Sequence, residues 1–141
     1  MIDDTTSAYI AGLLDGEGTI TLTRVHRNEN RRLVVSISNN ELPLLQFVKD
    51  ALGVGKITRK RHYQTQHQPS FTYQVTSRQA LAVLTRVTPY LRSYNRQRAE
   101  VVIKEYISVI PRNGRYTQAV STARKRFEDR ILGITAPGPL E

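Results

Sequence analysis

The chain has 141 residues, enough for one domain with a hydrophobic core of its own and too few for two ordinary domains. Its 21 lysines and arginines outnumber its 12 acidic residues, and the resulting net charge of +9 favours a polyanion as partner. Cysteine is absent, which excludes disulfides and thiolate metal sites, and no apolar run approaches the roughly 20 residues of a membrane span, so we expect a soluble, intracellular protein with no membrane partner.

The first predicted helix ends at Glu17 and combines small residues with a carboxylate at its end. The hydroxyl residues at positions 5–7 are candidate N-caps, and apolar residues follow at helical spacing. Gly12 and Gly16 lie one turn apart, although glycine costs roughly 1 kcal/mol relative to alanine inside a helix. Two glycines on one face therefore indicate that another backbone packs against them. If that backbone is a second copy of the helix, the two Glu17 carboxylates meet, and their repulsion favours a shared cation.

Two strands and a second helix follow along the chain. Residues 19–23 alternate strictly between threonine and aliphatic side chains, which predicts a half-buried strand. After the turn-like segment 27–30, the aliphatic residues Leu33, Val35 and Ile37 alternate with the other residues of 32–38, so the two strands are expected to form a hairpin. Residues 41–52 carry leucine and valine at helical spacing, and the glycines at 53 and 55 end that predicted helix.

The hairpin pattern then occurs a second time and is followed by further helices. Residues 56–63 and 71–76 are predicted strands, and residues 80–87 and 96–110 are predicted helices. This αββαββα order predicts an α+β fold with one four-stranded antiparallel sheet, helices on one face and the other face open. The whole chain is expected to form a single domain, 1–141, whose proline-containing tail at 136–141 is disordered.

A stretch of the first helix, IAGLLDGEG at residues 10–18, closely resembles the signature of the LAGLIDADG homing endonucleases. Glu17 stands in the place of the family's second acidic residue, which is the catalytic metal ligand. The chain length, the alternating segment after the motif and the basic charge agree with a one-motif member, and the resemblance covers roughly residues 5 to 110. It implies that Glu17 and the Gly16 carbonyl hold Mg²⁺, or another divalent cation such as Mn²⁺. It also implies a homodimer whose interface contains Ala8, Ala11, Gly12, Asp15 and Gly16.

The resemblance places two further groups near the metal. A polar residue at the end of the second strand, Asn39 here, occupies a catalytic position of the family. The family's lysine is expected soon after the Pro-aromatic-Leu pattern at 89–91, where this sequence has no lysine. Either Arg92 or Arg96 supplies the charge, or the role is lost. A basic helix start that only binds phosphate is the competing interpretation.

The open face of the predicted sheet carries hydroxyl, amide and cationic side chains, which suit base edges and phosphates. A two-stranded ribbon fits the DNA major groove, where arginine or lysine reads guanine and glutamine reads adenine. A solvated face is the alternative, because threonine-rich outer faces are common in antiparallel sheets. Arg61 is assigned to phosphate at the sheet edge. The predicted DNA-binding residues are Thr19, Thr21, Thr23, Arg32, Ser36, Ser38, Lys56, Thr58, Lys60, Arg61, Thr72 and Gln74.

The function implied by the resemblance is that of an intron-encoded, site-specific endonuclease. A homodimer would make a metal-dependent double-strand break in a long, near-palindromic duplex and leave short 3′ overhangs. Two alternatives share the fold: an RNA-binding maturase that assists splicing of a host intron, and a DNA-binding regulator that does not cleave. The presence of Glu17 disfavours the regulator, and a maturase would not need an intact metal site.

Overall fold

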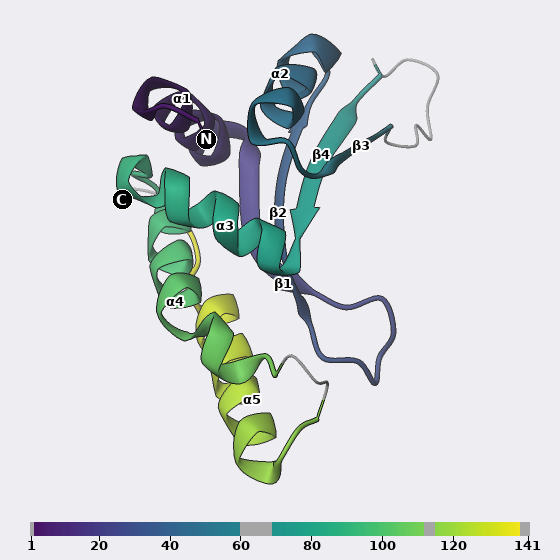
Figure 1. The fold of residues 1–141 in the computed structure, drawn as a ribbon, viewed down its shortest axis with the longest axis vertical. Coiled ribbons are helices and arrows are strands. Elements are labelled where there is room, and N and C mark those ends of the chain that lie inside the picture. The colour runs from purple at the N-terminus through teal and green to yellow at the C-terminus, as the bar shows by residue number, and fades with distance from the viewer. Residues whose placement is uncertain (1, 60–68, 112–114, 139–141) are drawn as a thin grey trace.

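A four-stranded antiparallel sheet forms the centre of the molecule, and its strand order is β1-β2-β4-β3. The computed structural model describes residues 2–59, 69–111 and 115–138 (Figure 1). The two hairpins join side by side through their second strands, so β1 and β3 form the edges. This architecture confirms the α+β prediction. The strands are β1 (Gly18–Thr23), β2 (Arg32–Asn39), β3 (Lys56–Arg59) and β4 (Phe71–Thr76).

The helices divide into those that cover the sheet and those that extend from its β1 edge. In Figure 1, the first three helices lie over one face of the sheet, and the last two run side by side away from it. None of the helices in the described ranges has the length and apolar character needed to cross a membrane. The helices are α1 (Asp4–Glu17), α2 (Leu42–Leu52), α3 (Ser77–Val87), the short 3₁₀ helix η1 (Thr88–Tyr90), α4 (Tyr94–Val109) and α5 (Gln118–Gly133).

The core lies between the sheet and the helices, and strand alternation determines which residues enter it. Ile20 and Leu22 of β1 point into the core with the alternating apolar residues of β2 and β4. Helix α5 was missed by the sequence prediction, because only Phe127 and Ile131 of its apolar residues are buried in the core. Its sequence is otherwise largely charged or polar, so apolar periodicity is weak.

Some predicted element boundaries were wrong. The N-cap of α1 is Asp3 and not a residue at positions 5–7, because the Asp3 carboxylate accepts a 2.7 Å hydrogen bond from the Thr6 amide. The bonds from Thr6 hold the pKa of Asp3 below its usual value. Helix α4 begins two residues earlier than predicted, with Ser93 as its N-cap. The first strand of the second hairpin is described as far as Arg59, and the rest of the predicted strand, 60–63, lies outside the described residues. Residues 139–141 of the predicted tail also lie outside them.

Candidate metal site and nucleic-acid interface

Glu17 is the last residue of α1, and its side chain is exposed where the helix meets the sheet. Strand β1 begins at the next residue, Gly18, with no intervening loop. A Cβ atom at Gly18 would lie 2.7 Å from the Leu14 Cα, which is closer than any side chain tolerates. Glycine is therefore required for the direct turn from helix to strand. This turn places the Glu17 carboxylate at one end of the open sheet face.

A buried asparagine that the sequence analysis did not single out holds this junction in place. Asn95 is 1% exposed, and its Nδ2 donates to the Leu14 carbonyl at 3.1 Å and to the Gly18 carbonyl at 3.4 Å. The Oδ1 of Asn95 is buried and has no partner among the described residues. The available signal was its spacing, because Asn95 lies one turn before Ala99 on the buried stripe of α4.

Asp15, which the sequence analysis places at a dimer interface, links α1 to the start of α4 within the same chain. Its carboxylate accepts hydrogen bonds from the Arg92 amide at 2.8 Å, the Ser93 amide at 3.0 Å and the Ser93 hydroxyl. Burial raises the pKa of Asp15, but these hydrogen bonds and the charge of Arg92 outweigh it and leave the pKa below its usual value. The carboxylate is therefore ionised at neutral pH.

The two arginines that were candidates for the family's lysine have different surroundings. Arg92 is exposed and close enough to lower the pKa of Asp15, so its charge lies beside the acidic end of α1. The Nε of Arg96 donates to the Glu100 carboxylate at 2.9 Å, one turn further along α4. The structure thus brings Arg92 to the Asp15–Glu17 end of α1 and pairs Arg96 with its own helix.

Asn39 lies at the same end of the sheet as Glu17. Gly18 of β1 pairs with Ile37 of β2, and Asn39 is two residues beyond that pair. Its Oδ1 accepts a 2.8 Å hydrogen bond from the Glu41 amide, which fixes the entry to α2. The sequence assignment to a catalytic position is compatible with this location, and the observed contact is structural.

One face of α1 carries small residues and is open. Ala8, Gly12 and Gly16 recur at intervals of four residues, and all three are exposed. A Cβ atom at either glycine would meet nothing within 4 Å apart from neighbouring atoms of its own helix. There is accordingly room for another backbone against this face. The prediction that Ala11 belongs to the same interface was wrong, because Ala11 is 0% exposed in the core of its own chain and cannot contact a partner.

The open face of the sheet brings together the predicted reading residues in rows across the strands. Thr19 pairs with Ser36, which pairs with Gln74, which pairs with Lys56. Every one of these positions points away from the core because strand alternation places the core residues between them. The other described members of the set lie in the neighbouring rows: Thr21, Thr23, Arg32, Ser38, Thr58 and Thr72.

Two features make the polar groups of this face unequal. Ser38 and Thr72 share a 2.9 Å hydrogen bond between their hydroxyls, so part of the hydrogen-bonding capacity of these hydroxyls is already used. Val34 is paired with Thr21 and is only 6% exposed, which makes that row less polar than its neighbours. Lys60 and Arg61 lie outside the described residues.

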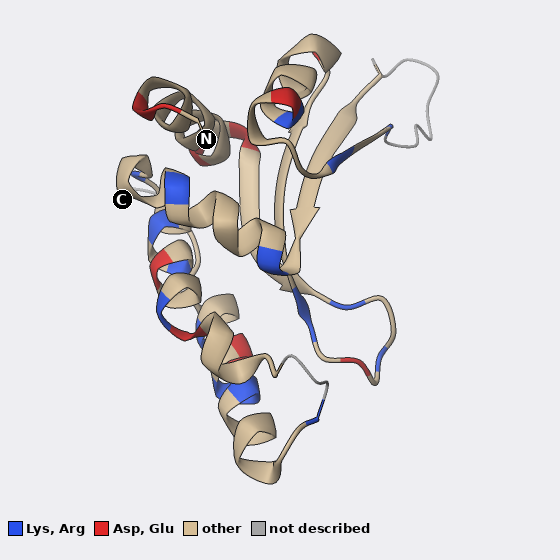
Figure 2. Cartoon of the chain, viewed as in Figure 1, with Lys and Arg blue, Asp and Glu red and all other residues tan. Residues whose placement is uncertain are grey.

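The cations of the described chain lie mainly outside the strands, on the helices and the β1–β2 loop. Figure 2 shows strands that are mostly uncharged, while the loop between β1 and β2 and helices α4 and α5 carry much of the blue. On the described strands the cations are Arg32, Lys56 and Arg59. The face therefore offers mostly neutral donors and acceptors. Such groups discriminate between bases, whereas cations bind phosphates of any sequence.

The carboxylate and carbonyl at the end of α1 supply oxygen ligands of the kind that Mg²⁺ prefers. Among the described residues no group of three histidine, aspartate or glutamate side chains is placed to hold a metal ion. Glu17 and the Gly16 carbonyl fit such an ion only as part of a larger set. The carboxylate and histidine side chains of the described residues do not complete that set.

Comparisons with known proteins agree with this geometry. The model of the LAGLIDADG-like domain matches residues 4–105. The homing endonuclease I-CvuI, solved in complex with its target in the presence of calcium, has a TM-score of 0.76 at 20% identity, and the match covers 96% of this chain and 85% of that chain. The homing endonuclease I-GzeII, in complex with a DNA target, has a TM-score of 0.66 at 16% identity, covering 93% of this chain and 44% of that chain.

A third similar structure, the homing endonuclease I-SmaMI bound to cleaved DNA, has a TM-score of 0.65 at 16% identity and covers 96% of this chain and 50% of that chain. This chain therefore spans about half of the longer I-GzeII and I-SmaMI chains and most of I-CvuI. Because the family model matches most of its residues, the chain belongs to the LAGLIDADG family. Its fold is that of the family's homing endonucleases.

Proposed function

We propose that this protein is a homodimeric homing endonuclease that makes a metal-dependent double-strand break in a long, near-palindromic DNA site. The exposed carboxylate of Glu17, placed where the small-residue face of α1 meets the open sheet, is the observation that carries the proposal. The DNA complexes of I-CvuI and I-SmaMI, which share the fold, support it. The net charge of +9 suits a polyanionic substrate.

The open face of α1 supports a dimer. Two copies packed through Ala8, Gly12 and Gly16 would approach closely, because glycine leaves no side chain between the backbones. A two-fold axis through this contact brings the two Glu17 carboxylates together and points the two sheets in opposite directions. Each sheet then reads one half-site, and a two-fold protein requires a near-palindromic duplex.

At the centre, Glu17 and the Gly16 carbonyl would bind Mg²⁺ or Mn²⁺ together with phosphate oxygens. The bound cation would polarise the scissile phosphate and lower the pKa of a coordinated water. Arg92 lies beside this end of α1, and its guanidinium would stabilise negative charge on the phosphate without acting as a base. Cuts on both strands across the minor groove would leave short 3′ overhangs.

The recognition surface in this proposal is the open sheet face. Gln74, Ser36 and Thr19 lie in one row across three strands, where they would read base edges in the major groove. Lys56 and Arg32 at the margins would contact phosphates, which adds affinity without sequence preference.

The proposal is tested by selecting a DNA site with the wild-type protein and comparing cleavage of that site by the wild type and by Glu17→Gln. The wild-type protein is first used to select binding sites from a pool of randomised duplex DNA, and the selected duplex is then assayed for nicking with and without Mg²⁺. We expect Glu17→Gln to slow cleavage by roughly 10²–10⁴-fold, because metal-assisted charge stabilisation is worth several kcal/mol. Binding should stay within about threefold, because the substitution conserves volume and each threefold change is under 1 kcal/mol.

Asp50→Asn on α2 is the matched control, because it removes an exposed carboxylate from a different helix. It should cleave like the wild type. Cleavage by Glu17→Gln at a near wild-type rate would contradict the assignment of this residue, and failure of the wild type to select any duplex would contradict the proposal as a whole.

A further inference from the structure

The loop between β1 and β2 extends the sheet at the end remote from Glu17. Its eight residues, 24–31, exceed the two to five that are usual in a hairpin, and positions 24–30 are all exposed. Within the loop, the Glu29 amide donates to the His26 carbonyl at 3.1 Å, which forms a local turn. Such a loop would be expected to sample many conformations unless another element restrains it.

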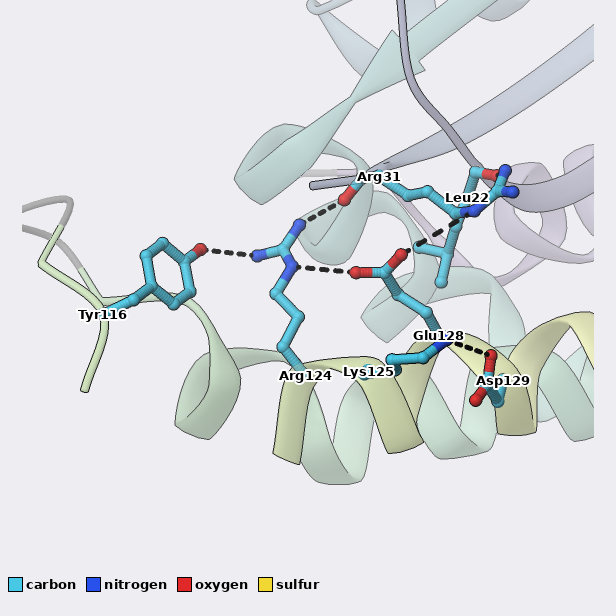
Figure 3. A network of polar contacts seen from close by, with 7 residues as sticks. All are labelled: Leu22, Arg31, Tyr116, Arg124, Lys125, Glu128 and Asp129. Carbon is cyan, nitrogen blue, oxygen red and sulfur yellow. Dashed lines mark hydrogen bonds and ion pairs between the residues drawn. The ribbon is translucent and has the colours of Figure 1, made fainter. Parts of the chain in front are cut away.

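Helix α5 provides that restraint through a buried arginine (Figure 3). Arg124 is 6% exposed, and each nitrogen of its guanidinium donates to a different partner. Nη1 donates to the Tyr116 hydroxyl at 2.9 Å, Nε donates to Glu128 at 3.3 Å, and Nη2 donates to the backbone carbonyl of Arg31 at the end of the loop. A guanidinium this deeply buried is costly to desolvate unless its donors are all used. The loop carbonyl is thus part of what keeps Arg124 satisfied.

The side chain of Arg31 makes a second connection between the loop and α5. Glu128 lies between two arginines, with one oxygen 3.3 Å from Arg124 Nε and the other 3.7 Å from Arg31 Nε. Arg31 Nη1 also donates to the Leu22 carbonyl of β1 at 3.4 Å. Figure 3 shows these contacts as one network from α5 through the loop to the strand. The C-terminal end of the loop is therefore held through both the backbone carbonyl and the side chain of Arg31.

We propose that Arg124 is a positioning residue: by fixing the β1–β2 loop it sets base discrimination at the outer part of each DNA half-site. The inference rests on the proposed function. Strand β1 has six residues between Glu17 and the loop, and at about 3.3 Å per residue the loop lies roughly 20 Å from the carboxylate along the strand. Its exposed Arg24 and Arg27 would meet DNA far from the dimer axis. A loop that is ordered before DNA arrives loses less entropy on binding.

Arg124 itself is not a phosphate contact in this arrangement. Its guanidinium is buried and engaged, whereas Lys125 at the next position of α5 is exposed and pairs with Asp129 at 3.6 Å. The two neighbours therefore form a matched pair. One is connected to the loop, and the other is a surface cation of the same helix.

The test compares base preferences of Arg124→Gln, Tyr116→Phe and the control Lys125→Gln. Each protein is presented with the duplex selected by the wild type and with all single-base variants of it, and relative affinities are measured by competition. We expect Arg124→Gln to reduce discrimination at the outer base pairs by about 5–100-fold, the range of one base contact, and to keep it at the inner pairs. Tyr116→Phe, which removes one hydroxyl, should show the same pattern weakly. Lys125→Gln should keep the wild-type pattern.

Amide hydrogen exchange of the free proteins provides a second measurement that does not depend on DNA. Arg124→Gln should speed exchange of amides in residues 24–31 while α1 and the strands keep wild-type rates. Unchanged outer preferences, or an equal loss at every base pair, would overturn the inference while leaving the proposed function intact. If the wild type selects no sequence at all, the proposed function fails first, and the exchange rates still report whether Arg124 orders the loop.

Discussion

The open sheet face and the C-terminal helices both contain many polar side chains, but they use them in opposite ways. On the sheet, hydroxyl and amide groups such as Thr19 and Gln74 stand in rows on the open side, with few charges among them. In α4 and α5, Arg98 and Arg124 are buried, and their donors bond to main-chain and side-chain oxygens of the same protein. The sheet presents its polar groups on its open side, and the two buried arginines of the helices use theirs within the protein.

This difference shows that net charge alone does not locate a nucleic-acid surface. Arg98 donates to the Ile20 carbonyl at 2.8 Å and the Ile134 carbonyl at 2.7 Å, and it stacks on Tyr94. Arginine can serve in this way because its planar guanidinium satisfies several acceptors at once. Part of the positive charge of the chain is therefore structural, and Arg98 and Arg124 are not available to a polyanion.

The largest expected effect lies at the small-residue face of α1. Gly12→Leu inserts a side chain where two backbones are proposed to meet, and overpacking costs about 1–3 kcal/mol per side chain, twice in a symmetric dimer. We expect a monomer by analytical ultracentrifugation at concentrations where the wild type is a dimer. Gly133→Leu at the end of α5 is the control, because its Cβ also meets nothing within 4 Å. An unchanged dimer in Gly12→Leu would place the interface elsewhere.

The next effect concerns the supporting region. Arg98→Met removes the donors to two carbonyls, and we expect a loss of about 2–4 kcal/mol in the free energy of unfolding, measured in urea. Lys104→Met removes an exposed cation from the same helix and should change the stability by less than about 0.5 kcal/mol. If both variants unfold alike, Arg98 is not the structural element that its contacts indicate.

A smaller effect is expected on the reading face, and it should appear in specificity rather than in stability. Gln74→Ala should reduce discrimination by about 1–3 kcal/mol at one symmetry-related pair of positions in the selected duplex. Its salt dependence should stay close to that of the wild type, because no phosphate contact is lost. Gln79→Ala on the helical side is the matched control. Wild-type preferences in Gln74→Ala at every position would argue against this face as the reader.

The smallest effect is a pH dependence at the contact between α1 and the start of α4. The folded pKa of Asp15 is lowered, so its ionised form stabilises the protein above the unfolded pKa of about 4, and this contribution is lost as the pH falls through the folded pKa. Asp15→Asn should cost about 1–2 kcal/mol at pH 7 and flatten the acid limb of the stability curve. Asp129→Asn, which breaks an exposed ion pair, should leave that limb unchanged. If the free energy of unfolding falls equally steeply with decreasing pH in the wild type and in Asp15→Asn, Asp15 does not have this role.

The sequence predicted those features whose signal is local. Strict alternation in residues 19–23 predicted a strand with its threonines on the open side, and the structure confirms this face. Small residues ending in Glu17 predicted both the helix and the exposed carboxylate at its end. The placement of Ala11 at an interface was wrong, because spacing along one helix does not reveal which of two adjacent faces the rest of the chain covers.

Only the tertiary structure decided how the site is supported. The contacts from Asn95 to Leu14, from Arg92 to Asp15 and from Arg124 to Arg31 join residues separated by 81, 77 and 93 positions. Periodicity records which side of an element is apolar, so it predicted the first helix and the open sheet face. It carries no information on which distant carbonyl a buried amide or guanidinium will meet, because that depends on how the elements pack.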